Sequence, residues 1–289
     1  MKKITVISGK GGTGKTTLTA NFSALAKNHV IADCDVDAPN MHLLLKPEVK
    51  KEDTFKAGKL AVRDADKCTD CGLCYENCRF NAINEDFSIN PIKCEGCSVC
   101  AEVCPVDAIN MEKVITGQIY DSTTDYAPMI HARLKAGAEN SGKLVSEVRD
   151  KAEKKAKVED RDVVLVDGSP GIGCPVIASL NGVDMALIVT EPSKSGLSDL
   201  KRVIEMIEHF DIEAKVIINK YDLNENMADT IEKFCNEQGI DVLERIPFSA
   251  LFVDMLREGK LVVEEKSQSK AGKIIIDLWD EILEDVENL

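Results

Sequence analysis

A glycine-rich loop near the start of the chain constrains the fold more than any other feature of the sequence. The segment Gly9–Thr16 reads GKGGTGKT and fits the pattern G-x-x-x-x-G-K-[ST]. It follows an apolar, β-branched run, Ile4–Ser8, and opens a segment of helical character, Thr16–Lys27. Glycines let backbone N–H groups close around phosphate oxygens, and the positive end of the following helix faces the same anion. The loop therefore predicts a strand–loop–helix unit that binds a nucleotide phosphate.

Two side chains of this loop are expected to carry its chemistry. Lys15 would reach the terminal phosphates, and the hydroxyl of Thr16 would ligate Mg²⁺. The alternative is a glycine turn that binds nothing, which the strand before the loop and the helix after it disfavour. The predicted nucleotide contacts in this segment are Gly11, Gly12, Thr13, Gly14, Lys15, Thr16 and Thr17.

Much of the remaining chain alternates between buried-strand and helix patterns. The expected strands are Ile4–Ser8, Val30–Asp33, Val163–Asp167, Ala186–Thr190 and Val216–Asn219. The expected helices are Thr16–Lys27, Lys143–Lys157, Leu197–His209 and Glu225–Glu237, with Ser141 and Ser195 as N-caps. This alternation predicts an α/β fold with a doubly wound, mostly parallel sheet.

The alternation stops between about Pro47 and Glu112, where eight of the eleven cysteines fall. We expect one α/β domain made of residues 1–48 and 113–289, interrupted by a small inserted domain, residues 49–112. The insert contains an internal repeat, because residues 68–83 match residues 94–109. So many cysteines in a chain of this size indicate metal binding rather than a disulfide scaffold.

Each half of the repeat spaces its cysteines as C-x2-C-x2-C-x3-C. Three thiolates of one loop can wrap the corners of a cubane cluster, while the fourth points away and serves the other cluster. One [4Fe–4S] cluster would use Cys68, Cys71, Cys74 and Cys104, and the other Cys78, Cys94, Cys97 and Cys100. Two structural zinc sites are the alternative, although these normally come as separated C-x2-C pairs.

Several further motifs resemble the MinD/ParA family of ATPases, which includes the nitrogenase iron protein and the Mrp-type cluster carriers. Lys10, a second lysine early in the glycine-rich loop, marks the deviant Walker A motif of that family. Residues 33–40, DCDVDAPN, look like its switch I, and residues 163–171, VVLVDGSPG, look like its Walker B strand and switch II. Asn219-Lys220 is similar to the pair that contacts adenine, and residues 246–248 to the loop that closes over the base.

The resemblance covers about residues 1–45 and 130–260 and implies an Mg²⁺-dependent ATPase that forms a homodimer when ATP is bound. Lys10 would contact phosphate across that dimer, and Asp35 would orient the attacking water. The implied catalytic residues are thus Asp35, Lys10 and Lys15, and the implied Mg²⁺ ligands are Thr16, Asp33 and Asp167. The implied contacts with the base of ATP or ADP are Asn219, Lys220 and Pro247. Taken alone, the aspartates at 33, 35 and 37 could be ordinary carboxylates at a strand end.

The insert resembles a bacterial ferredoxin with two [4Fe–4S] clusters. It departs from that pattern at Arg79, which stands where the first cysteine run would have proline. Proline is not a ligand, so the predicted cluster binding is unaffected, but a nearby guanidinium could raise the potential of that cluster. Of the other cysteines, Cys34 and Cys235 are expected in the core. Cys174 is either an ordinary thiol or part of a site for a transferable metal or cluster at the dimer interface.

Composition excludes several partners. The formal net charge of −14 argues against sequence-independent nucleic-acid binding, and no apolar run is long enough to span a membrane. The segment from Lys270 to Leu289 predicts an amphipathic helix whose acidic polar side an anionic bilayer would repel, so we expect it to pack on the ATPase body. Nothing marks the chain for export, and the expected location is the cytoplasm.

Together these features predict an iron–sulfur ATPase whose nucleotide state gates electron transfer or cluster delivery to a partner metalloprotein. A redox-sensing ATPase that signals through its dimer state is the alternative, and it predicts that oxidation changes the ATPase rate. A ParA-like spatial organiser is disfavoured by charge, and an amidating ligase by the lack of room for a glutaminase domain.

Overall fold

A computed structural model describes residues 1–135, 137–138, 141–210 and 212–288. The chain forms two compact units. The larger unit comprises Met1–Asp53, Ile119–Leu134 and Ser141–Leu289, and the smaller one, here called the cysteine unit, comprises Thr54–Gln118 and Lys135–Asn140. The domain boundaries predicted after residues 48 and 112 stay a prediction.

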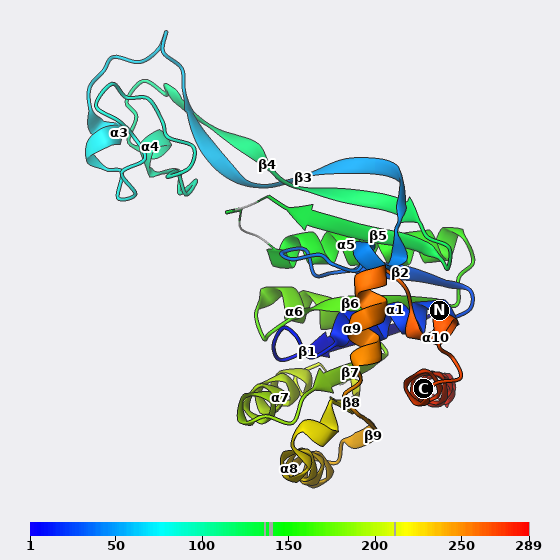
Figure 1. The fold of residues 1–289 in the computed structure, drawn as a ribbon. Coiled ribbons are helices and arrows are strands. Elements are labelled where there is room, and N and C mark those ends of the chain that lie inside the picture. The colour runs from blue at the N-terminus through cyan, green and yellow to red at the C-terminus, as the bar shows by residue number, and fades with distance from the viewer. Residues whose placement is uncertain (136, 139–140, 211, 289) are drawn as a thin grey trace. The chain divides into compact units, whose positions relative to one another are not determined.

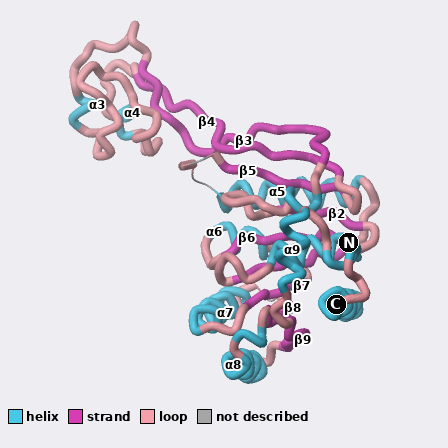
Figure 2. Tube along the Cα trace, viewed as in Figure 1, coloured by secondary structure: helices cyan, strands magenta, loops and turns pink. Residues whose placement is uncertain are grey.

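A nine-stranded sheet has the order β3-β4-β5-β2-β6-β1-β7-β8-β9. In this spatial order, all neighbouring strands from β5 through to β9 pair in parallel. Helices cover both faces of this part of the sheet, so Ile4 to Ile7 of the central strand β1 are fully buried (Figures 1 and 2). The strands are β1 (Lys2–Ser8), β2 (His29–Asp33), β3 (Glu48–Arg63), β4 (Ile109–Thr123), β5 (Pro128–Leu134), β6 (Val163–Pro170), β7 (Met185–Thr190), β8 (Glu213–Asn219) and β9 (Asp241–Ile246).

The helices of the larger unit divide between the two faces of its sheet. One face packs on α1 (Lys15–Leu25), α2 (His42–Leu45), α10 (Val262–Glu265) and α11 (Lys270–Asn288). The other packs on α6 (Cys174–Leu180), α7 (Lys194–Ile207) and α8 (Glu225–Glu237), while α5 (Ser141–Val158) contacts β2, β5 and β6. The remaining pieces are a 3₁₀ turn, Tyr221–Leu223, and α9 (Ala250–Glu258). The predicted α/β class with a mostly parallel sheet is confirmed.

The C-terminal helix packs as its sequence pattern predicts. Ile275, Leu278, Trp279, Ile282 and Val286 of α11 are all at most 2% exposed and belong to the core of one sheet face. Trp279 stacks on Phe22 of α1 with the ring centroids 5.3 Å apart. This helix is therefore part of the larger unit.

The cysteine unit has little regular structure apart from parts of β3 and β4. Its helices are single turns, α3 (Leu73–Glu76) and α4 (Val99–Glu102), each following a residue with positive φ, Gly72 and Ser98. Its small core consists of Ala61, Cys74, Ile83 and Ile109, against which other cysteines pack. Both turns lie at matching positions of the sequence repeat, so the two halves fold alike.

The predicted strands and helices of the larger unit are all present, with ends that differ by a few residues. The predicted cap of α7 is wrong: Ser193, not Ser195, caps this helix, because its Oγ accepts the N–H of Gly196 at 2.9 Å. Ser141 is the first residue of α5 itself, and the residue before it lies outside the described residues. The sequence analysis did not predict several elements: β3, β4, β5, β9, α2, α6, α9, α10, the 3₁₀ turn Tyr221–Leu223, and the single-turn helices α3 and α4 of the cysteine unit.

Candidate functional site

A cavity of about 580 Å³ lies where the parallel strands of the larger unit end. The glycine-rich loop follows β1, and switch-like segments follow β2 and β6, so their side chains meet at one edge of the sheet. The sequence-predicted residues that line the cavity are Gly11, Gly12, Thr13, Gly14, Lys15, Thr16, Thr17, Asp35, Asn219, Lys220 and Pro247. Its size is that of a small-ligand site.

Beneath the loop, Asp167 of β6 holds three side chains. Its Oδ1 is 2.7 Å from Lys15 Nζ and accepts the Thr19 hydroxyl at 3.1 Å, and its Oδ2 accepts the Thr16 hydroxyl at 2.7 Å. Asp167 is fully buried and Lys15 is 5% exposed. A buried lysine is tolerated here because its carboxylate partner and the surrounding hydroxyls offset its desolvation.

Asp33 and Asp35 place further negative charge beside this group. Asp33 is the register partner of Asp167 in the neighbouring strand, and burial together with the Asp167 carboxylate raises the pKa of Asp33 well above its usual value. Its Oδ2 is buried and has no hydrogen-bond partner among the described residues. Burial also raises the pKa of Asp35, while Lys15 opposes the shift. Two of these carboxylates, Asp33 and Asp167, together with the Thr16 hydroxyl, are oxygen groups of the kind that a hard cation prefers.

Lys10 does not line the cavity. Its Nζ is 2.5 Å from Glu191 Oε1 and donates to the hydroxyls of Ser195 at 2.9 Å and Ser193 at 3.4 Å. Glu191 follows β7, and its other oxygen is 3.8 Å from Lys220 Nζ. The carboxylate of Glu191 thus joins Lys10 of the loop to Lys220 beyond β8. Sequence reasoning missed this role, because one glutamate after a strand carries no motif.

The last residue of β8 and the residue that follows it contact the glycine-rich loop directly. Asn219 Nδ2 donates to the carbonyl of Thr13 at 2.7 Å, and Lys220 Nζ donates to the carbonyl of Gly12 at 3.0 Å. Gly14 has a φ of 98°, and a Cβ there would lie 2.3 Å from Asn219 Nδ2. Both the backbone conformation and the close approach therefore require glycine at this position.

The cavity also has an apolar wall. Phe248 belongs to the loop at residues 246–248 that the sequence analysis named, whereas Phe252, Val253 and Leu256 come from α9, which it did not predict. Their spacing is helical, so a periodicity search confined to this segment could have found the helix. An apolar wall opposite a phosphate loop suits a ligand with one charged end and one flat, weakly polar end.

The cysteine unit groups its eight repeat cysteines around two further cavities. Cys78, Cys94, Cys97 and Cys100 line one of them. Cys68, Cys71, Cys74 and Cys104 line the other. In each cavity, three cysteines come from one half of the repeat and the fourth from the other half.

Hydrogen bonds to sulfur repeat in the same way. The N–H of Ala82 donates to Cys78 Sγ at 3.3 Å, and the N–H of Ala108 donates to Cys104 Sγ at 3.2 Å. The cavity that contains Cys68 also has a charged side chain in its wall, that of Arg63. Arg63 pairs with Asp70 at 3.2 Å and lies over the Phe87 ring. Such donors and charges tune the potential of a metal cluster bound to the thiolates.

Among the described residues no three His, Cys, Asp or Glu side chains form a site for a single metal ion.

The other three cysteines are separate from these groups. Cys34 and Cys235 are buried, as predicted, and burial raises the pKa of both thiols, that of Cys235 to about 12. Cys174 is exposed at the first residue of α6, against Gly142 of α5. Arg79 lies over the ring of Phe80.

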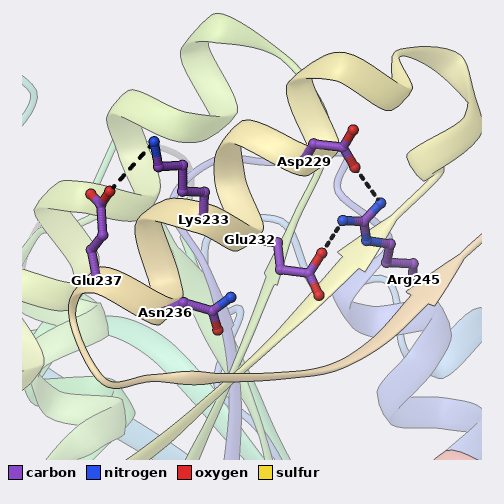
Figure 3. A pocket seen from close by; sticks show the side chains of 6 residues that line it. All are labelled: Asp229, Glu232, Lys233, Asn236, Glu237 and Arg245. Carbon is purple, nitrogen blue, oxygen red and sulfur yellow. Dashed lines mark hydrogen bonds and ion pairs between the residues drawn. The ribbon is translucent and has the colours of Figure 1, made fainter.

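A depression over α8 and β9 is lined by charged side chains that already pair with one another (Figure 3). Arg245 pairs with Asp229 at 2.7 Å and with Glu232, and Lys233 pairs with Glu237 at 3.9 Å. The bond to Asp229, supported by Glu232, raises the pKa of Arg245. We interpret this group as a network that joins α8 to the edge strand β9 rather than as a ligand site.

Comparison with known proteins identifies the larger unit. Residues 4–262 match the model of the CobQ/CobB/MinD/ParA nucleotide binding domain, which is most of the chain. The chain belongs to this family. The membership agrees with the phosphate-loop geometry and confirms the predicted class of P-loop ATPase.

Individual CobQ/CobB/MinD/ParA relatives match most of this chain. An uncharacterised protein of Methanocaldococcus jannaschii is 37% identical over 286 residues, covering 98% of this chain and 96% of the relative. The iron-sulfur cluster carrier protein of the same organism is 24% identical over 270 residues, covering 85% and 72%. The solved structure of MinD complexed with Mg-ADP from Pyrococcus horikoshii has a TM-score of 0.59 at 21% identity, covering 97% of this chain and 95% of that chain.

None of the described helices is both long enough and apolar enough to span a bilayer.

Proposed function

We propose that this protein binds and hydrolyses ATP and couples its nucleotide state to electron transfer, or to cluster assembly and delivery, for a partner metalloprotein. One observation carries the proposal: a single chain holds both a phosphate-loop cavity and two groups of four cysteines. The low-identity similarity to iron-sulfur cluster carrier proteins supports the same combination.

Mg²⁺ fits the residues under the loop. Thr16, Asp33 and Asp167 would hold it, directly or through water. The unpartnered oxygen of Asp33 and the raised pKa of its carboxyl both indicate a place where a cation relieves electrostatic repulsion. When bound, the ion would neutralise charge on the nucleotide phosphates.

Three residues would act on the phosphates and the attacking water. Lys15 would give up its present bond with Asp167 and bind the terminal phosphates instead. Asp35, 9% exposed and with a raised pKa, is suited to orient a water molecule and accept its proton. Lys10 would leave Glu191 to reach phosphate in a second copy of the chain. A Lys10→Ala variant should then lose ATP-dependent dimerisation while it still binds ADP, as measured by light scattering and calorimetry.

Two [4Fe–4S] clusters fit the cysteine unit. Cys68, Cys71, Cys74 and Cys104 would hold one, and Cys78, Cys94, Cys97 and Cys100 the other. The support is the grouping of four cysteines in each cavity and the N–H···S bonds at matching positions. A cubane is larger than one ion and keeps its thiolates farther apart, so the unit need not form a single-ion site to bind it. Bound clusters would accept and release single electrons.

Metal analysis with EPR tests the cluster assignment. Anaerobically purified protein should contain iron and sulfide for two clusters, Cys104→Ser should lose the signal of one cluster, and Cys78→Ser that of the other. A Cys235→Ala variant, altered in the core of the larger unit, should keep both. Zinc without sulfide in anaerobic, iron-replete protein would contradict the assignment.

A redox titration tests the coupling. Potentials should be measured without nucleotide, with ADP and with a non-hydrolysable ATP analogue. A shift of tens of millivolts corresponds to about 1 kcal/mol of coupling and supports ATP-gated electron transfer. Unchanged potentials together with nucleotide-dependent transfer of iron to an apoprotein would select cluster delivery. A third outcome is an ATPase rate that changes on oxidation of the protein, with neither a shifted potential nor transfer of iron. That outcome would favour a redox-sensing switch over both electron transfer and cluster delivery.

A further inference from the structure

The walls of the two cysteine cavities match each other position by position. In the sequence repeat Cys68 corresponds to Cys94, an offset of 26 positions. At this offset, apolar wall residues of one cavity correspond to apolar wall residues of the other: Leu73 to Val99, Ile83 to Ile109, and Phe80 to Val106. The backbone N–H···S bonds also lie at matching positions. Shape and hydrogen bonding to sulfur therefore give little reason for two bound clusters to differ in potential.

Charge is what distinguishes the two walls. Here each cavity is named after the cysteine that the other half of the repeat contributes, so Cys68, Cys71 and Cys74 line the Cys104 cavity, and Cys94, Cys97 and Cys100 line the Cys78 cavity.

The charged wall residues differ between the cavities in both sign and number. Arg63 lines the Cys104 cavity, whereas Ile89, at the same offset, lines the Cys78 cavity. Thr69 lines the Cys104 cavity, and its counterpart in the Cys78 cavity is Glu95. Among the described residues of both walls, Arg63 is the one cation. Its positive charge faces the carboxylate of Asp70 in the same wall, whereas Glu95 has no cation in its wall.

Neighbouring groups fix Arg63 on the wall of the Cys104 cavity. Its Nη1 is 3.2 Å from Asp70 Oδ1 and donates to the carbonyl of Asp86 at 3.3 Å, and its guanidinium lies over the Phe87 ring. The Arg63 side chain is 23% exposed and that of Asp70 is 65% exposed, so water screens the carboxylate more than the guanidinium. Asp70 opposes Arg63 by accepting the S–H of Cys68 at 3.4 Å. Even with full cancellation the wall is neutral, which is one unit more positive than the wall with Glu95.

We propose that Arg63 gives the cluster in the Cys104 cavity the higher potential, so that a single electron taken up by the cysteine unit rests on that cluster. This inference rests on the two-cluster assignment of the proposed function. Reduction adds one negative charge to a cluster, which a nearby cation stabilises and a nearby carboxylate opposes. An electron given by a low-potential one-electron donor to the cluster in the Cys78 cavity would move on. That step oxidises one cluster and reduces the other by one electron, and it requires no proton.

An anaerobic titration of the full chain with dithionite, followed by EPR, tests the proposal. Wild type should be reduced in two separate one-electron steps, of which Cys104→Ser loses the upper and Cys78→Ser the lower. Arg63→Ile introduces the residue of the matched position and should lower the upper step while the lower step stays in place. At a fixed potential the ratio of reduced to oxidised upper cluster should fall about tenfold, which corresponds to about 59 mV.

Three more substitutions separate charge from packing. Arg63→Lys keeps a cation and should retain most of the upper potential. Arg63→Gln loses the charge but keeps an N–H donor for the Asp86 carbonyl, so it should reproduce the fall without depending on how well isoleucine packs. Glu95→Thr introduces the matched neutral residue and should raise the lower step.

Lys113→Ile is the matched control. Lys113 is an exposed cation of β4 in the same unit and lines neither cavity, so its removal should leave both steps unchanged. The iron and sulfide content of each Arg63, Glu95 and Lys113 variant, compared with wild type, shows whether the cysteine unit is folded with both clusters in place.

Three results would overturn the inference. One is an Arg63→Ile or Arg63→Gln variant that holds both clusters and keeps the wild-type upper potential. Another is a Lys113→Ile variant whose upper step falls as far, which would mean that net charge alone sets the potential. The third is a wild type whose two clusters titrate together, or whose upper step survives in Cys104→Ser. Anaerobic wild type without iron and sulfide would instead refute the cluster assignment of the proposed function, and the inference with it.

Discussion

Acid should destabilise the larger unit through His29, the first residue of β2. His29 is 1% exposed, and neither ring nitrogen has a hydrogen-bond partner among the described residues. Burial, helped by the nearby Arg161 charge, lowers its pKa from 6.5 to about 4. The folded protein therefore keeps the imidazole neutral at pH values where the unfolded chain already binds a proton.

The sign and size of the effect follow from this difference. The contribution of His29 is fully present above pH 6.5 and is lost as the pH falls toward 4, because only the unfolded chain gains the proton in that window. At about 1.36 kcal/mol per pKa unit the total is about 3 kcal/mol, of which about 2 kcal/mol is lost between pH 7.5 and pH 5. His131, whose pKa burial also lowers to about 4, adds a similar loss.

Urea unfolding followed by Trp279 fluorescence at pH 7.5 and pH 5 measures this loss. His29→Leu removes the titrating ring from a site where the ring makes no hydrogen bond. Between pH 7.5 and pH 5 the free energy of unfolding should fall in both proteins, and the fall should be about 2 kcal/mol smaller in His29→Leu than in wild type. The exposed His209, changed to Leu, should leave the wild-type loss unaltered. Equal acid losses in His29→Leu and wild type would refute the reasoning.

Two further substitutions test the site. Asp167→Asn leaves the buried Lys15 without its carboxylate, so the free energy of unfolding should fall by about 3–5 kcal/mol and ATP turnover should cease; an unchanged thermal midpoint would contradict the ion pair. Gly14→Ala places a Cβ against Asn219 at a residue with positive φ, and it should lower the ADP affinity measured by calorimetry tenfold or more. Gly239 also has a positive φ, but the space around its Cβ position is open. Gly239→Ala should therefore cost only about 1 kcal/mol of stability and leave ADP binding intact.

The sequence predicted the central strands because these are buried on both faces and therefore apolar throughout. It did not predict β3, whose residues Glu48–Arg63 are mostly exposed and charged, nor β9, an edge strand whose Asp241, Glu244 and Arg245 interrupt the apolar run. On such strands backbone pairing decides the conformation, and side-chain pattern carries little of that information.

The predicted site residues fall into two groups in the structure. Those from Gly11 to Thr17 line the cavity, because a loop of consecutive residues is positioned by the strand before it and the helix after it. Lys10 belongs to the same loop but does not line the cavity, because Glu191, 181 positions along the chain, holds its ammonium group. Long-range contacts of this kind depend on how the strands are ordered in the sheet, which no local pattern encodes.

The order of strands also determines when each unit can be completed during synthesis. The central strand β1 pairs with β6 and β7, and β2 pairs with β5 and β6, so their partners all follow the eight repeat cysteines in the chain. Both groups of four cysteines, in contrast, lie between residues 68 and 104. A nascent chain emerging from the ribosome thus carries every thiol of the cysteine unit before it carries the strands that flank the phosphate loop. Loading of the proposed clusters can therefore precede completion of the sheet in the life of each molecule, and a chain that stalls before residue 163 would hold its eight thiols but lack β6 and β7, the neighbours of β1.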